Sequence, residues 1–150
     1  MSFAEWFRSD PRSRALDAIA AIAARYRDLA ANLERHSQAS TYPTIRTALQ
    51  RLSAEKIEQA EELGRFLATE GCKLPTPSPM SLDGASNWLR LKADLALEAE
   101  SMRDLNQAIA RLEGGEHRPA KWLRDFAANE ERCLGELRDV VLRCDTYALD

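Results

Sequence analysis

The sequence has no excess of charge of one sign, no long apolar run and few cysteines, and each absence excludes a class of protein. The 21 basic residues are interspersed among 24 acidic ones, and the formal net charge is −3, so no surface for nucleic acid or anionic lipid is indicated. The apolar runs are far shorter than the roughly 20 residues that span a bilayer. Cys72, Cys133 and Cys144 form no C-x-x-C pair, and the N-terminus lacks the basic region and apolar core of a signal peptide. We therefore expect a soluble, cytoplasmic protein that binds neither nucleic acid nor a membrane.

The composition favours helices and a single core. The chain has 150 residues, of which 45% are hydrophobic, and this is the size of one domain spanning residues 1–150. It is rich in Ala, Leu, Arg and Glu, and it lacks the β-branched alternation that is typical of strands. We therefore predict an all-α domain.

Proline, glycine and capping residues divide the chain into four helices of similar length. Asp10-Pro11 supplies a cap and a first-turn proline, Pro43 and Pro119 begin the second and fourth helices, and glycines end the second and third. Ahead of them, residues 1–10 form an N-terminal aromatic segment, "SFAEWFR", which we expect to cover one end of the bundle or to contact a second subunit. The expected helices are 11–34, 43–70, 83–113 and 119–144.

The connection between the second and third helices differs from the other two. Residues 71–82 contain three prolines, so their middle cannot be helical. A segment of this length reaches roughly 35 to 40 Å, which is about the length of a 27-residue helix. Short, long and short connections are the ferritin-like order, with an extended crossover that makes helices 2 and 3 parallel. The alternative is an up-down-up-down bundle with a loose middle loop.

The inward seam of each helix carries a polar residue near its midpoint. Along the second helix the alternating steps of three and four residues run through Lys56 and Gln59, and along the third and fourth they run through Glu98 and Glu130. The first helix contributes Tyr26. Because helix midpoints lie at similar heights in a bundle, these five residues are expected to form one buried polar layer. An isolated buried charge is costly, so the layer is either a metal site or a salt-bridge cluster, unless the side chains reach water at the edge of the seam.

Around this layer the chain resembles the ferritin-like superfamily, in particular rubrerythrin-like proteins. The motifs are "IAAIAARY", "KIEQAEEL", "EAESMRDL" and "EERCLGEL", one from each helix. The family's di-iron site takes Glu from the first helix, Glu-x-x-His from the second, Glu from the third and Glu-x-x-His from the fourth. Two of these six ligand positions keep a family ligand. The six positions are held here by Ile19, Lys56, Gln59, Glu98, Glu130 and Cys133.

The resemblance, with these departures, implies a ferritin-like bundle with a degenerate di-iron site. Lys56 places a cation where metal ions would balance Glu98 and Glu130, so we expect no cofactor and a role in protein association, as a homo-oligomer such as a dimer or with a protein partner. The alternative is a metal-dependent oxidase or peroxidase that holds iron, manganese or zinc through Glu98, Glu130 and Cys133.

Two further expectations concern Cys133 and the histidines. A third function is a thiol-based redox sensor, in which Lys56 lowers the pKa of Cys133; on the other hand, buried cysteines most often only pack. His36 and His117 lie near helix ends and are expected at the loop surface or as caps, away from the layer.

Overall fold

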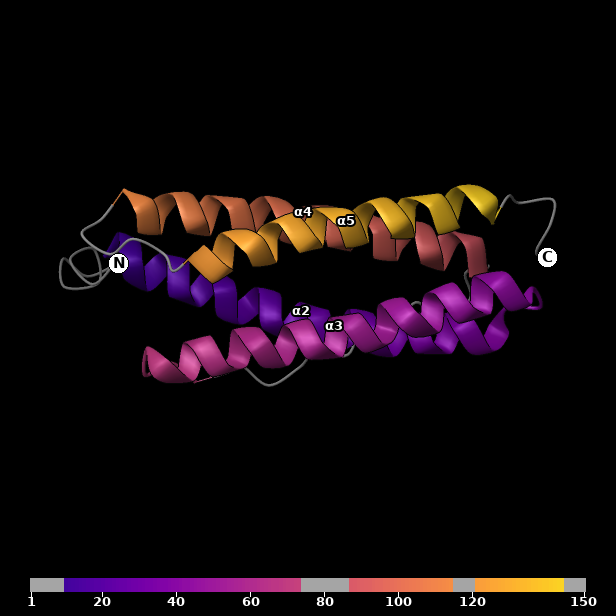
Figure 1. The fold of residues 1–150 in the computed structure, drawn as a ribbon, viewed down its shortest axis with the longest axis horizontal. Coiled ribbons are helices and arrows are strands. Elements are labelled where there is room, and N and C mark those ends of the chain that lie inside the picture. Colours follow the sequence, from indigo (N-terminus) through magenta and orange to yellow (C-terminus); the bar gives the residue numbers. More distant parts are fainter. Residues whose placement is uncertain (1–9, 74–86, 115–120, 145–150) are drawn as a thin grey trace, which may run out of the picture.

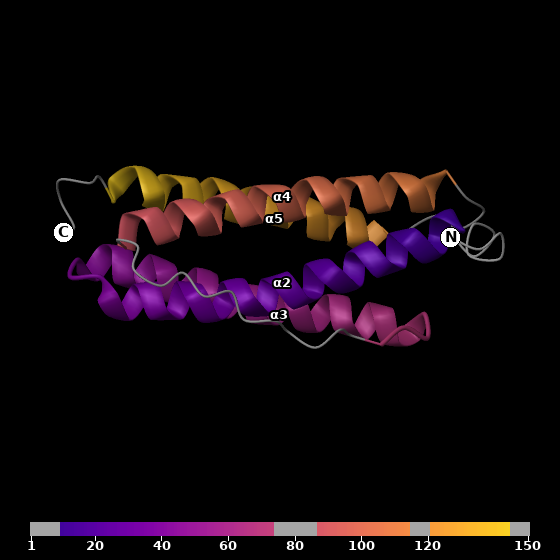
Figure 2. The same cartoon turned by 180° about the vertical axis from the view of Figure 1, so that it is seen from behind.

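Four long helices make up the part of the chain that the computed structural model describes, residues 10–73, 87–114 and 121–144. No strand occurs within these ranges, and Figures 1 and 2 show the four helices side by side in an elongated bundle. The prediction of an all-α four-helix bundle is therefore confirmed. The N-terminal aromatic segment, most of the 71–82 loop and His117 lie outside the described residues. The helices are α2 (Pro11–Ala39), α3 (Pro43–Thr69), α4 (Asn87–Glu113) and α5 (Lys121–Arg143).

The helix ends follow the local signals in the sequence, with one exception. The Asp10 side chain accepts a hydrogen bond from the backbone N–H of Arg12, and Gly71 adopts a φ of 75° just after α3, a conformation that glycine tolerates best. α2 continues to Ala39, beyond the expected end near Glu34. The reason is that residues 34–40 contain neither Gly nor Pro, so nothing stops the helix before the extended backbone of Ser40.

Side-chain contacts fix the direction of each helix. In the contacts that α2 makes, the residue numbers increase along α2 and decrease along α3 and α4, so α2 is antiparallel to both. α3 and α4 therefore run in the same direction (Figures 1 and 2). The up-down-up-down alternative, in which α3 and α4 would be antiparallel, does not describe these helices. α5 is antiparallel to α3, with which it pairs through Arg51–Glu136 and Arg132–Glu55. The α2 pairs are Arg12–Glu70 and Tyr26–Lys56 with α3, and Arg25–Asp104 and Asn32–Asp94 with α4.

The apolar core consists of two clusters, and the residues between them are polar. One cluster contains Ile19, Leu63 and Leu105, and the other contains Leu33, Leu52 and Leu137. On α3 the first cluster begins at Ala60 and the second ends at Leu52, so Lys56 and Gln59 fall between them. The bundle therefore has a polar layer at mid-length with an apolar cluster on either side.

The buried face of α4 is wider than the predicted seam. Leu91, Glu98 and Leu105 are buried as expected, but Asp94 and Ser101 are buried as well. The predicted seam positions Leu95 and Met102 are only half-buried. The cause is that α4 packs against both α2 and α5, so two lines of its surface are covered. None of the four described helices combines the length and the apolar character that crossing a membrane requires.

Candidate functional site

The centre of the polar layer is an ammonium group between two carboxylates. Lys56 of α3, Glu98 of α4 and Glu130 of α5 each expose no more than 2% of their surface. The Lys56 Nζ donates to Glu130 Oε2 at 2.5 Å and also to Glu98 Oε1. Each of these residues lies on the seam of its own helix at the same height, which is why three separate helices bring their charges together.

Tyr26 of α2 covers the fourth side of the layer. The Lys56 Nζ lies 4.4 Å from the centroid of the Tyr26 ring, a cation–π distance. Two of the three ammonium protons therefore go to carboxylates, and the ring face stabilises the remaining charge. Burial raises the pKa of Tyr26 well above its ordinary value, and the nearby charge of Glu130 raises it further. Tyr26 is therefore a neutral member of the layer at physiological pH.

The layer holds one cation and two carboxyl groups, so its charge depends on a proton. Burial lowers the pKa of Lys56, but Glu98 and Glu130 outweigh this effect and raise it, so the ammonium is retained. Burial also raises the pKa of Glu98 to about 7, a shift that Lys56 opposes and Glu130 reinforces. Glu98 Oε2 and Glu130 Oε1 accept no hydrogen bond from the described residues. A proton on Glu98 thus removes one of two like charges and adds a donor where acceptors are in excess.

Gln59 and Cys133, two further residues at expected ligand positions, contact each other. Gln59 Nε2 donates to Cys133 Sγ at 3.5 Å, and Cys133 Sγ donates to Glu55 Oε2 at 2.9 Å. Burial and the bond to Glu55 raise the pKa of Cys133 to about 12, although Lys56 acts in the opposite direction. Lys56 thus lowers this pKa as expected, but burial and Glu55 have larger effects, so the net shift is upward. A neutral thiol of this kind is a poor nucleophile.

Glu55 is a contact that sequence reasoning missed. It lies off the apolar seam of α3, and its carboxylate accepts from both Cys133 and Arg132. Burial raises the pKa of Glu55, but these hydrogen bonds outweigh burial and lower it, so Glu55 is charged. Two ion pairs between residues i and i+4 lie at the boundary between the two helices, Arg51–Glu55 on α3 and Arg132–Glu136 on α5. That charge pattern was the available signal.

A second buried polar cluster is centred on Asp94, about one helical turn from Glu98 along α4. His36 Nδ1 is 2.7 Å from Asp94 Oδ2, and Asn32 Nδ2 donates to Asp94 Oδ1 at 3.3 Å. The His36 side chain is only 6% exposed, so its expected position at the loop surface or as a cap is wrong. Asn32 and His36 each follow a buried leucine, Leu29 or Leu33, by three residues, and this spacing placed them on the inner face of α2.

The residues present do not fit a di-metal centre. Glu98 and Glu130 both accept hydrogen bonds from the Lys56 ammonium, and the Cys133 thiol donates a hydrogen bond to Glu55. Ile19 lies in the apolar cluster with Leu63, about 10 Å of helix rise from Tyr26. Within residues 10–73, 87–114 and 121–144 no three His, Cys, Asp or Glu side chains are grouped to hold a metal ion. Of the set Glu98, Glu130 and Cys133, the two carboxylates face the Lys56 ammonium, whereas the thiol faces Glu55.

Comparison of the chain with models of protein families, with curated proteins and with solved structures finds no match. The resemblance to ferritin-like proteins therefore stays a prediction from the four helical motifs in the sequence.

Proposed function

We propose that this chain is a ferritin-like bundle in which a lysine–carboxylate layer has replaced the di-metal centre, and that it acts through protein association. The observation that carries the proposal is the Lys56 ammonium, which lies between Glu98 and Glu130 in a layer at mid-bundle. In a metal enzyme of this family, cations bind between those carboxylates. Here the chain supplies the cation itself.

The helix arrangement supports the ferritin-like part of the proposal. α2 packs on α3 and α4, and α5 packs on the same two helices, so each helix has two neighbours. Because α3 and α4 are parallel, the end of α3 and the start of α4 lie at opposite ends of the bundle (Figure 1). In the proposal, residues 71–82 are the crossover between these ends, and the protein works in the cytoplasm.

The electrostatics of the layer oppose binding of a metal ion. A divalent cation would have to displace the ammonium or share two carboxylates with it at contact distance. Removing one partner of a buried ion pair typically costs about 3 to 5 kcal/mol. Metal binding would therefore have to overcome the pairing of Lys56 as well as the lack of further ligands.

One end of the bundle supports the role in association. Tyr42, Leu89 and Leu142 are 44%, 50% and 73% exposed, and they lie in the α2–α3 connection, the first turn of α4 and the last turn of α5. The helix directions place all three at the same end. Large apolar side chains that are exposed at one end of a molecule are a feature of interaction surfaces. We therefore propose that this end forms a dimer contact.

Sedimentation velocity of the full chain across a range of concentrations tests this contact. Tyr42→Asp is expected to shift the protein to a monomer, whereas Ile57→Asp, at a similarly exposed position in the middle of α3, leaves the association unchanged. A wild-type protein that stays monomeric at 100 μM would contradict the dimer. Consumption of peroxide by iron-supplemented protein, lost in Glu98→Ala, would overturn the proposed function in favour of the metal-dependent alternative.

A further inference from the structure

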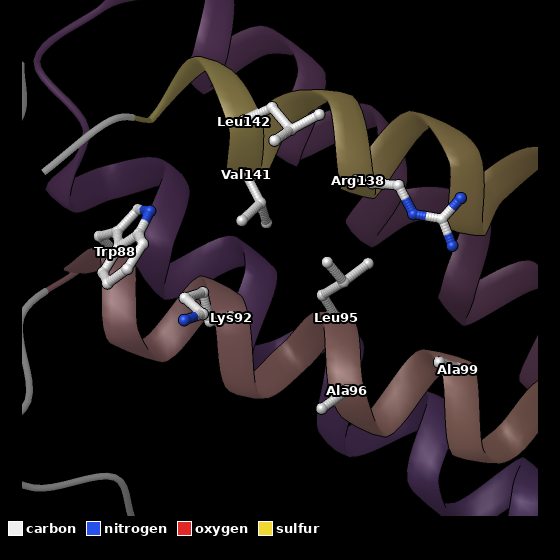
Figure 3. Close-up of a pocket in the computed structure, with 8 residues that line it drawn as sticks. All are labelled: Trp88, Lys92, Leu95, Ala96, Ala99, Arg138, Val141 and Leu142. Atoms are coloured by element: carbon white, nitrogen blue, oxygen red, sulfur yellow. The ribbon is translucent and has the colours of Figure 1, made fainter.

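The outer surface between α4 and α5 carries a second line of apolar residues in addition to the core-facing seam. A hollow of about 680 Å³ lies between the first part of α4 and the last part of α5, where Trp88, Leu95 and Val141 face the gap and Leu142 lies beside it on α5 (Figure 3). A second hollow of about 370 Å³ is lined by Met102 and other residues further along the same two helices.

The two hollows lie in one groove. On α4 their lining residues follow each other in steps of four and three, which keeps them on one face of the helix. The residues are Trp88, Lys92, Leu95, Ala99, Met102 and Ile109, with Asn106 between the last two. From Trp88 to Ile109 the groove is about 32 Å long, the length of a helix of roughly 20 residues.

The floor of the groove suits a helix more than a compact ligand. Ala96 and Ala99 of α4 and Ala127 and Ala128 of α5 are small, so the backbone of a third helix can approach closely. A repeat of three and four residues on the facing helices is the pattern into which the side chains of another helix pack. A small molecule of ordinary size would fill one hollow and leave the other open.

The charges of the larger hollow are of one sign. Lys92 and Arg138 are its charged lining residues, and no carboxylate lines it. Neither has an ion pair with any described residue, although the Lys92 Nζ lies 4.4 Å from the centroid of the Trp88 ring. The positive charges are therefore available to a partner.

The spacing of the two cations also matches a helix. The ion pair between Glu113 of α4 and Arg124 of α5 sets the register of these antiparallel helices. Ala99 lies fourteen residues before Glu113, and Arg138 lies fourteen residues after Arg124. Arg138 is thus level with Ala99, seven residues beyond Lys92, which is about 10 Å along the groove. Two carboxylates at positions i and i+7 of a helix have this separation.

We propose that the outer α4–α5 groove is a docking site for an amphipathic helix of a partner protein, whose apolar face carries two carboxylates seven residues apart at one end. This rests on the proposed role in protein association and names the kind of partner. The other described helices do not offer such a face in a second copy of the chain, because Tyr42 and Ile57 are the large exposed apolar residues of residues 10–73.

A labelled synthetic peptide tests the site on the full chain. The probe is an 18-residue amphipathic helix with a leucine and alanine face and two glutamates seven residues apart, and its control has lysines at those two positions. Fluorescence anisotropy is expected to show binding of the glutamate peptide that weakens with added salt, and at least tenfold weaker binding of the lysine peptide.

Variants of the groove separate docking from non-specific adhesion. A double variant that combines Lys92→Glu with Arg138→Glu is expected to weaken peptide binding at least tenfold. Ala99→Leu, which fills the groove, is expected to weaken it by at least as much. Matched controls away from the groove, Arg27→Glu on α2 and Ala110→Leu on the exposed face of α4, should change it less than twofold. Circular dichroism checks that each variant is folded.

Several results would overturn the proposal. These are no binding of the glutamate peptide at 1 mM, equal binding of the two peptides, or groove variants that bind as the wild type does. Tighter binding of dodecanoate than of the peptide would assign the hollow to a small amphiphile, and self-association abolished by the double variant would assign it to a second copy. Peptide binding together with stoichiometric metal would refute the proposed loss of the metal centre but leave the docking site standing.

Discussion

The proton on Glu98 predicts how the stability of the protein depends on pH. Burial raises its pKa from the ordinary value of 4.5 to about 7, so the folded state binds this proton more tightly than the unfolded state does. The resulting stabilisation is fully present below pH 4.5 and is lost as the pH rises to about 7. The free energy of unfolding should therefore fall with rising pH in this range, opposite to the usual behaviour of a carboxylate in a salt bridge.

The magnitude follows from the two pKa values. A tenfold change in proton affinity is worth about 1.4 kcal/mol, so the full difference between low and high pH is about 3 kcal/mol. Between pH 5.5 and 8.5 the loss is about 2 kcal/mol, because part of it has already occurred by pH 5.5. In Glu98→Gln the side chain is neutral at every pH, and this contribution to the slope disappears.

Urea unfolding of wild type and of Glu98→Gln, at several values of pH from 5.5 to 8.5, measures this contribution. Subtracting the free energy of unfolding of the variant from that of the wild type removes the effect of groups that titrate alike in both proteins. The wild type should lose about 2 kcal/mol relative to Glu98→Gln over this range. Glu61→Gln, at an exposed position on α3, serves as the control and should parallel the wild type. Profiles of wild type and Glu98→Gln that stay parallel within about 0.5 kcal/mol would refute the assigned proton.

Three other perturbations test the layer and its surroundings. Lys56→Met should lower the free energy of unfolding by about 3 to 5 kcal/mol, since it leaves two buried carboxylates without their cation; urea midpoints equal to those of wild type would show that Lys56 is not coupled to them. Cys133 should react with iodoacetamide at pH 7.5 at least tenfold more slowly than the half-buried Cys72, followed by peptide mass spectrometry, and faster reaction would restore the thiol-sensor hypothesis. Asp94→Ala should cost about 1 to 3 kcal/mol because it leaves the buried Asn32 amide without its acceptor, and an unchanged thermal midpoint would argue that this hydrogen bond contributes nothing.

The sequence predicted the helices and the polar layer because both depend on periodicity. Prolines and glycines mark the helix boundaries, and a charged residue on an otherwise apolar seam is conspicuous. Lys56, Glu98 and Glu130 could therefore be placed together without a structure, because each lies at the midpoint of a helix of similar length.

The contacts that sequence reasoning missed depend on how each helix is rotated against its neighbours. Asp94 is next to Leu95, a residue of the predicted seam of α4. Asp94 is buried because α2 packs on one side of α4 while α5 packs on another. The bond from Cys133 to Glu55 likewise joins an on-seam residue to an off-seam one. Periodicity gives the direction of a side chain to within about one residue step, and this is too coarse to choose between two adjacent lines of a helix.

The pKa of Cys133 shows a related limit. Sequence reasoning identified Lys56 as its neighbour and inferred a lowered pKa, but the hydrogen bond to Glu55 and the depth of burial were not visible. Two neighbours with opposite effects can be weighed only when both distances are known.

Metal analysis of the purified protein tests the central claim most directly. The protein is expressed in cells supplemented with iron and manganese, purified without chelators, and measured by inductively coupled plasma mass spectrometry beside Glu98→Ala and Glu130→Ala. The lysine–carboxylate layer predicts well under 0.1 metal ion per chain in all three, on the order of adventitious binding. Near-stoichiometric iron, manganese or zinc in the wild type that is lost in both variants would contradict it.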